Sequence, residues 1–113
     1  MTRLKSSVLL VPRFPPAELI RLAQLSEAEG YDAFWLADER FFREVHTHLT
    51  LAALHTDRIM IGNMVTDPYV RHPAISAMAI ASVDEIADGR AAFGLGAGVS
   101  GFREMGIARR KPA

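Results

Sequence analysis

Two adjacent acids, Asp38 and Glu39, directly follow a short apolar run and are side chains that could do chemistry. A carboxylate at the end of a strand often caps the next helix. It can also exchange a proton with a bound molecule, as a general acid or base does. For Glu39 a charge that only faces solvent is an equal alternative, so both interpretations stay open on these residues alone.

A second candidate is the stretch GNMVTDPYVRHPA, residues 62–74, which mixes turn residues with charges and an aromatic ring. A plain connection that leads into a helix explains Asp67 and the two prolines of this stretch. It does not explain why Tyr69 and Arg71 stand there together. The composition therefore indicates a loop that holds something in place.

Glycines in the pattern Gly96-x-Gly98-x-x-Gly101 match the spacing of a dinucleotide-binding loop and follow an apolar run. The match is partial, because this run is the fourth in the chain and the sequence has no acidic ribose partner about 20 residues later. Gly96 and Gly98 can equally let the backbone approach a ring or a side chain. A Rossmann-type dinucleotide-binding domain is thus one alternative.

The four histidines do not have the spacing of a metal site. His46 and His48 are two residues apart on a predicted helix and so point to different faces, whereas a zinc-binding pair would be four apart. His55 lies near the end of that helix, where an imidazolium complements the helix dipole. His72 precedes Pro73 where a helix begins, and we expect a capping or packing role. Since the chain also has no cysteine, the sequence predicts no metal.

Short apolar runs and helical repeats alternate along the chain and must position these residues. The runs with strand character are residues 6–12, 34–37, 58–62 and 91–98. The segments with helical spacing are residues 15–30, 42–53 and 75–86. The order βαβαβαβ predicts a parallel sheet with helical crossovers. The first run is rich in Val and Leu and is stopped by proline, so we expect a strand buried on both faces.

Two architectures fit this order, a doubly wound open sheet and a (β/α)8 barrel. Both bring the carboxyl ends of parallel strands to one edge, which we call the carboxyl rim. The residues expected at this rim are Asp38, Glu39 and the segments 64–71 and 96–100. Because both architectures share the rim, its residues do not choose between them.

Composition bounds the remaining possibilities. The 113 residues suffice for one domain, and 13 basic and 13 acidic residues give no net charge, so neither a nucleic-acid surface nor a membrane surface is expected. The amino-terminal apolar run is too short for a signal peptide or a membrane span. We expect a cytoplasmic protein.

Four ordered stretches resemble the amino-terminal part of the luciferase-like monooxygenase family: GYDAFWLADERFF, IGNMVTDPYVRHPA, ASVDEIADGRAAFGLGAG and SGFREMGI. The resemblance runs from about Val8 to Ile107 and is greatest to the branch similar to methylenetetrahydromethanopterin reductases. It implies an α/β fold, the amino-terminal part (about βαβαβαβ) of a TIM-type (β/α)8 barrel with parallel strands. Because a full barrel takes roughly 250 residues, residues 1–113 are expected to be a partial domain that stops as its fourth helix begins.

The resemblance also implies a site for FMN or the deazaflavin coenzyme F420 at the carboxyl rim. It implies an oxidoreductase that transfers hydride, or with FMN inserts an oxygen atom, acting on a small organic substrate. Asp38 and Glu39 are the catalytic candidates, Glu39 standing where many relatives have histidine. A non-proline cis peptide between Met64 and Val65 is expected to press on the ring, with the Met64 side chain pointing away. The implied cofactor contacts are Asp38, Met64, Val65, Thr66, Ala97, Gly98 and Val99.

A function from another class remains open beside the enzyme. Four parallel strands taken from a barrel leave two unpaired edges and an inner apolar face without its opposite wall. The chain could therefore be a non-catalytic remnant or subunit that associates through these edges. Its partner would be a second copy of the chain or another barrel fragment.

Overall fold

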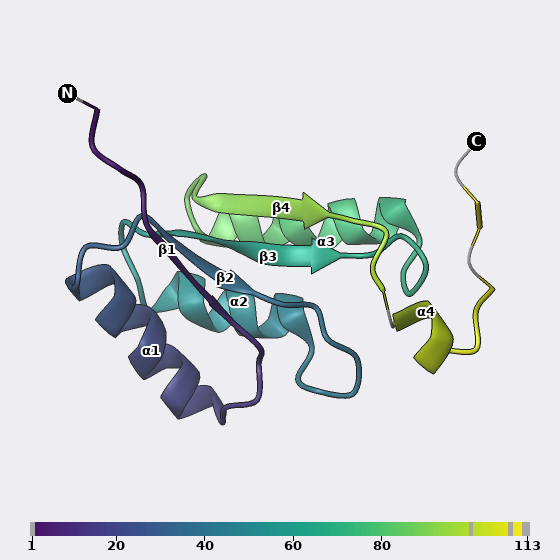
Figure 1. Cartoon of the computed structure of the whole chain (residues 1–113). Helices are drawn as coiled ribbons and strands as arrows, with labels where there is room; N and C mark the ends of the chain where they lie inside the picture. The colour runs from purple at the N-terminus through teal and green to yellow at the C-terminus, as the bar shows by residue number, and fades with distance from the viewer. Residues whose placement is uncertain (1, 100, 109, 112–113) are drawn as a thin grey trace.

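The computed structural model describes residues 2–99, 101–108 and 110–111. It contains one sheet of four parallel strands, alternating with helices in the predicted order (Figure 1). The strands are β1 (Ser7–Leu10), β2 (Ala33–Leu36), β3 (Met60–Thr66) and β4 (Ala91–Leu95). The helices are α1 (Pro16–Ala28), α2 (Val45–Leu54), α3 (Pro73–Ile86) and the single turn α4 (Gly101–Glu104). Ser100, the last residue of the predicted rim segment 96–100, lies outside the described residues.

The strand order decides between the two architectures. The strands lie in the order β1-β2-β3-β4, and α1 packs on α2 as α2 packs on α3, so the three helices cover one face (Figure 1). A doubly wound sheet would reverse its strand order and carry helices on both faces. The fold is thus the α/β barrel type, as predicted, and the Rossmann-type alternative is wrong.

Local chemistry sets where the helices begin. α1 and α3 each start at a proline, Pro16 and Pro73, which suits the first helical turn because that turn needs no backbone donor. His72 caps α3, its Nδ1 accepting a hydrogen bond from the Ala74 N–H at 3.2 Å, which confirms its predicted capping role. α2 begins at Val45, later than the predicted residue 42, because the Glu44 carboxylate accepts the Thr47 N–H at 2.7 Å and caps the helix.

The core lies between the sheet and the three helices. Phe34 and Ile61, which pair across β2 and β3, are fully buried against the helix layer. The other buried apolar side chains of this layer include Leu19, Ala23, Leu36, Leu49, Ala52 and Val83. Burial of this apolar surface is the main stabilising contribution that the chain can make alone.

The opposite face of the sheet, here called the open face, has no helix packed on it in the described residues. Leu9 on β1 is 52% exposed, so the expectation that this strand is buried on both faces is wrong, because no second layer of the described residues covers this face. Trp35 lies over Gly62 on this face: a Cβ on Gly62 would stand 2.6 Å from the indole and 2.4 Å from the Ala92 carbonyl oxygen. The glycine therefore makes room for the indole ring.

β3 continues past the predicted end at Gly62 and bulges before it stops at Thr66. Asn63 pairs with Phe93 and Thr66 with Leu95, so β3 uses one residue more than β4 over this interval. The peptide between Met64 and Val65 inside the bulge is cis, which confirms the predicted isomer. β4 ends at Leu95 rather than at the predicted residue 98.

No helix in residues 2–99, 101–108 and 110–111 combines the length and apolar character that a membrane span needs.

Candidate functional site

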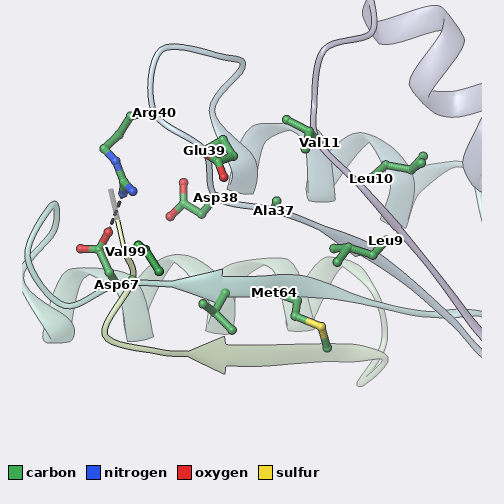
Figure 2. A pocket seen from close by; sticks show the side chains of 12 residues that line it. Leu9, Leu10, Val11, Ala37, Asp38, Glu39, Arg40, Met64, Asp67 and Val99 are labelled. Carbon is green, nitrogen blue, oxygen red and sulfur yellow. Dashed lines mark hydrogen bonds and ion pairs between the residues drawn. The ribbon is translucent and has the colours of Figure 1, made fainter. Parts of the chain in front are cut away.

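A cavity of about 500 Å³ opens at the carboxyl rim (Figure 2). All four strands contribute to its wall, at or just beyond their carboxyl ends. The lining residues are Leu9, Leu10, Val11, Ala37, Asp38, Glu39, Arg40, Met64, Val65, Asp67, Gly98 and Val99. Its size is typical of small-molecule sites, which are mostly apolar with a few placed polar groups.

Met64 and Val65 form an apolar platform in this cavity. Their residues are 39% and 42% exposed. Val65 packs against the backbone of β4, because a Cβ on Gly96 would lie 2.9 Å from Val65 Cγ2 and one on Gly94 would lie 3.4 Å from Val65 Cγ1. Gly96 thus admits a side chain of the neighbouring strand, one of the two roles considered for it.

Asp38 is held by partners from β3 and the loop that follows it. Its side chain is 8% exposed. Its Oδ2 accepts from the Thr66 hydroxyl at 2.9 Å and from Arg71 Nη1 at 2.5 Å, and its Oδ1 accepts from Arg71 Nη2 at 3.4 Å. The presence of Arg71 in the 62–74 stretch is therefore explained by its ion pair with Asp38.

Arg71 also reaches Glu44 at the start of α2, where Nη2 donates to Oε1 at 2.9 Å. Burial raises the pKa of Glu44, but hydrogen bonds from the His46 ring and from Thr47 outweigh burial, so this pKa lies well below the ordinary glutamate value. Burial lowers the pKa of Arg71, and the hydrogen bonds and charges of Asp38 and Glu44 raise it overall. The network keeps all of these charges paired.

A second ion pair, which the sequence analysis missed, joins Arg40 to Asp67 at 2.5 Å (Figure 2). Their side chains are 12% and 2% exposed. Asp67 Oδ1 also accepts the backbone N–H groups of Tyr69 and Val70 at 2.8 and 3.1 Å. The available signal in the sequence was charge complementarity. One rim loop carries Asp38 and Arg40, and the next rim loop carries Asp67 and Arg71.

Glu39 lies in the cavity wall between Asp38 and Arg40, which each form an ion pair. Its residue is exposed, and its carboxylate makes no hydrogen bond or ion pair with any residue that the structure describes. Met64, Val65, Gly98 and Val99 line the same cavity, so most of the predicted site residues are brought together.

Two predicted contact residues lie elsewhere. Thr66 is fully buried, and its hydroxyl is occupied by Asp38 and Asn63. Ala97 is exposed and is not part of the cavity wall. The histidines take structural positions: His46 and His48 are 8% and 6% exposed, and within the described residues no group of three potential ligands could hold a metal ion.

Four parallel strands in sequence order, helices on one face and a cavity at the carboxyl rim define this chain as the amino-terminal part of a (β/α)8 barrel. A family model described as luciferase-like monooxygenase matches residues 2–113. The chain belongs to this family.

Named relatives place the chain near one branch of the family. It is 41% identical over 103 residues to a 5,10-methylenetetrahydromethanopterin reductase of Methanolobus tindarius, covering 90% of this chain and 32% of the relative. A reductase of the same name from Archaeoglobus fulgidus is 39% identical, with 96% and 33% covered. The solved coenzyme F420-dependent tetrahydromethanopterin reductase of Methanopyrus kandleri superposes with a TM-score of 0.89 at 34% identity, covering 95% of this chain and 31% of that one. The chain thus spans about a third of the length of these relatives.

Proposed function

We propose that this chain is the amino-terminal part of an oxidoreductase that binds coenzyme F420 or FMN in the rim cavity, with the ring against Met64 and Val65. The observation that carries the proposal is the exposed apolar platform, which lies in the same cavity wall as the ion-paired carboxylates of Asp38 and Asp67. A flat ring with a polar edge needs this combination of an apolar wall and polar groups at one end.

The residues present fit such a ring. Met64, Val65, Gly98 and Val99 offer apolar surface, and Asp38 stands at the polar end with its orientation set by Arg71. When bound, the cofactor supplies hydride transfer at a ring carbon or, for reduced FMN with oxygen, oxygen insertion. The chain's own part is to orient the ring and the small organic substrate and to exclude water.

Coenzyme F420 is the better supported of the two cofactors. The relatives above 30% identity include reductases and an F420-dependent glucose-6-phosphate dehydrogenase of Kineococcus radiotolerans, 34% identical over 95 residues. The Pseudomonas putida monooxygenase solved with FMN is 22% identical and supports the fold alone. We therefore favour hydride transfer over monooxygenation.

Glu39 is the proposed proton-exchanging group. Asp38 is occupied by Arg71 and Thr66, whereas the Glu39 carboxylate is free of described partners and faces the cavity. Glu39→Gln removes the exchangeable proton and keeps the shape. We expect cofactor-dependent turnover to fall about 100-fold, with binding of the cofactor retained. Turnover unchanged in this variant would assign the proton to another group.

Cofactor titration with a matched pair of variants tests the site. Met64→Glu puts a charge in the cavity wall, and Met60→Glu puts the same charge on the same strand at the same 39% exposure, outside the cavity. Absorbance and fluorescence titrations should show binding of F420 weakened at least about tenfold by the first change, about 1.4 kcal/mol, and unaffected by the second. Equal effects, or no binding of F420 or FMN by the wild-type chain at tens of micromolar, would contradict the proposal.

A second candidate function rests on the open face. Leu9, Met60, Met64 and Val65 expose apolar surface there, and both edge strands carry unpaired backbone groups. We infer that this face is covered by further βα units, from a second copy or from a partner barrel fragment. Sedimentation and thermal unfolding at several concentrations test this. A monomer with a sharp melting transition independent of concentration would contradict it.

A further inference from the structure

Two polar side chains lie buried directly behind the apolar platform. Asn63 and Thr66 flank Met64 and Val65 in the chain, and both are 0% exposed. In the sheet register Asn63 pairs with Leu36, an apolar residue that is also fully buried. Placing polar groups here is unfavourable unless they are hydrogen-bonded, so their bonds indicate what they are for.

The hydrogen bonds of this pair run in one direction. The Gly94 carbonyl oxygen can only accept, so the Asn63 amide nitrogen donates to it at 2.8 Å. The same nitrogen donates to Thr66 Oγ1 at 2.7 Å. The Thr66 hydroxyl hydrogen is then free to go to Asp38 Oδ2 at 2.9 Å. The chain of bonds links β4, β3 and the loop after β2.

Asn63 uses only its donor group. Its Oδ1 is buried and has no hydrogen-bond partner in the described part of the chain. A buried polar atom without a partner is destabilising, whereas an apolar side chain of similar shape at this position would avoid that loss. Packing therefore does not account for asparagine here, and its two donated bonds do.

We propose that Asn63 and Thr66 are positioning residues for the cofactor ring. Their mutual hydrogen bond, which we call the clasp, spans the Met64–Val65 dipeptide from one side to the other. The second bond of the Asn63 amide, to the Gly94 carbonyl oxygen, holds the bulge against β4. Through the Thr66 hydroxyl the clasp also sets Asp38, so the apolar platform and the polar end of the cavity are held in one geometry. This inference rests on the proposed function.

A matched pair of variants at Thr66 tests the positioning role. Thr66→Val keeps the shape and removes the hydroxyl, whereas Thr66→Ser keeps the hydroxyl. We expect the Kd for F420 to rise about tenfold in the valine variant, equivalent to about 1.4 kcal/mol, and to stay within about twofold in the serine variant. Equal affinity in both variants would overturn the positioning role.

A readout without cofactor keeps the two proposals apart. The sequence has no cysteine, so Val65→Cys provides one thiol on the platform, whose reaction with a disulfide reagent reports how firmly the bulge is held. Combined with Thr66→Val the rate should rise several-fold, and with Thr66→Ser it should not. An unchanged rate of thiol reaction would overturn the clasp, whether or not the chain binds a cofactor. A raised rate in a chain that binds neither cofactor would leave the clasp standing and contradict the proposed function.

Asn63→Leu separates a loss of positioning from a failure to fold. It removes both donated bonds and the unpartnered Oδ1 together while keeping similar volume, so we expect the melting temperature to change little. The Kd for F420 should rise as in Thr66→Val, and the Val65→Cys thiol should react faster. A loss of stability without change in either quantity would show that Asn63 serves the fold alone and overturn the proposal.

Discussion

The two ends of the sheet use charged side chains differently. At the amino end, the Arg90 guanidinium donates to backbone carbonyls of four residues and to a threonine hydroxyl. Its partners are Ala53 O, Thr56 O, Thr56 Oγ1, Ile59 O and Ala87 O. The Glu27 carboxylate likewise accepts the backbone N–H groups of residues 57, 58 and 59. Arg90 and Glu27 therefore hold the backbone of loops at this end.

At the carboxyl rim the charges hold one another. Two ion pairs, Asp38–Arg71 and Arg40–Asp67, join the same two loops. In the first pair the acid lies on the loop after β2, and in the second pair the acid lies on the loop after β3. The carboxylate between them, Glu39, faces the cavity without a described partner. Arg90 and Glu27 at one end thus serve the fold, and the other end leaves a carboxylate and an apolar platform available, which is where barrel enzymes keep their chemistry.

Removing Arg90 should have the largest effect on stability. Arg90→Met leaves several carbonyl acceptors at the amino end without a donor, and we expect the free energy of unfolding to fall by about 3 kcal/mol. Urea unfolding should show a lower midpoint with an unchanged slope. Arg90→Lys should recover only part of the loss. The cofactor affinity of the folded fraction should not change. A changed affinity would contradict the separation of roles between the two ends of the sheet.

Gly94→Ala is the next largest change and acts at the other end. The added Cβ would lie 2.6 Å from the Asn63 carbonyl oxygen, which is backbone and cannot move away cheaply. We expect a loss of about 2 kcal/mol in urea unfolding. Gly96→Ala is the control, because its Cβ would meet the Val65 side chain at 2.9 Å, which can shift. It should lower stability less and disturb the platform more.

Arg71→Gln should destabilise the rim by about 1.5 kcal/mol, because a largely buried carboxylate, Asp38, loses its charged donor. Arg21→Gln breaks the Glu18 pair on α1, whose side chains are 59% and 39% exposed, and should leave the melting temperature nearly unchanged because exposed pairs add little to stability. Thermal unfolding of the two variants measures both. Equal losses would mean that the rim pair adds no more than a surface pair.

Acid should weaken the rim network, and of the expected effects on stability we rank this one last. The pKa of Glu44 is lower in the folded chain than in the unfolded chain, so its contribution to stability is complete above the unfolded value, about 4.3. That contribution is lost as pH falls toward the folded value. The urea midpoint should therefore begin to drop below about pH 5 and continue to drop as the pH falls further, and it should drop less in Glu44→Gln. Identical pH profiles would remove Glu44 from the network.

Element order, the cis peptide and the position of the cavity were predictable from the sequence. Alternating apolar runs and helical repeats are a local signal, and the resemblance carried the Met64–Val65 isomer. The exposure of β1 was not predictable, because a Val and Leu run reports that a strand is apolar and not whether a second layer covers its other face.

The placement of Thr66 and Arg40 also escaped sequence reasoning, for different physical reasons. Side chains alternate between faces along a regular strand, but the bulge in β3 breaks this alternation just before Thr66. Its side chain therefore points into the protein. Arg40 pairs with Asp67 across 27 positions of the chain, and such a contact exists only once the two loops are brought together.

The indole packed over Gly62 has a practical consequence. Trp35 is the single tryptophan of the sequence and lies on the open face, half-buried. Its emission wavelength depends on whether water or protein surrounds the ring. The chain therefore carries a built-in optical reporter, which should shift to the blue when a partner covers the open face and needs no added label.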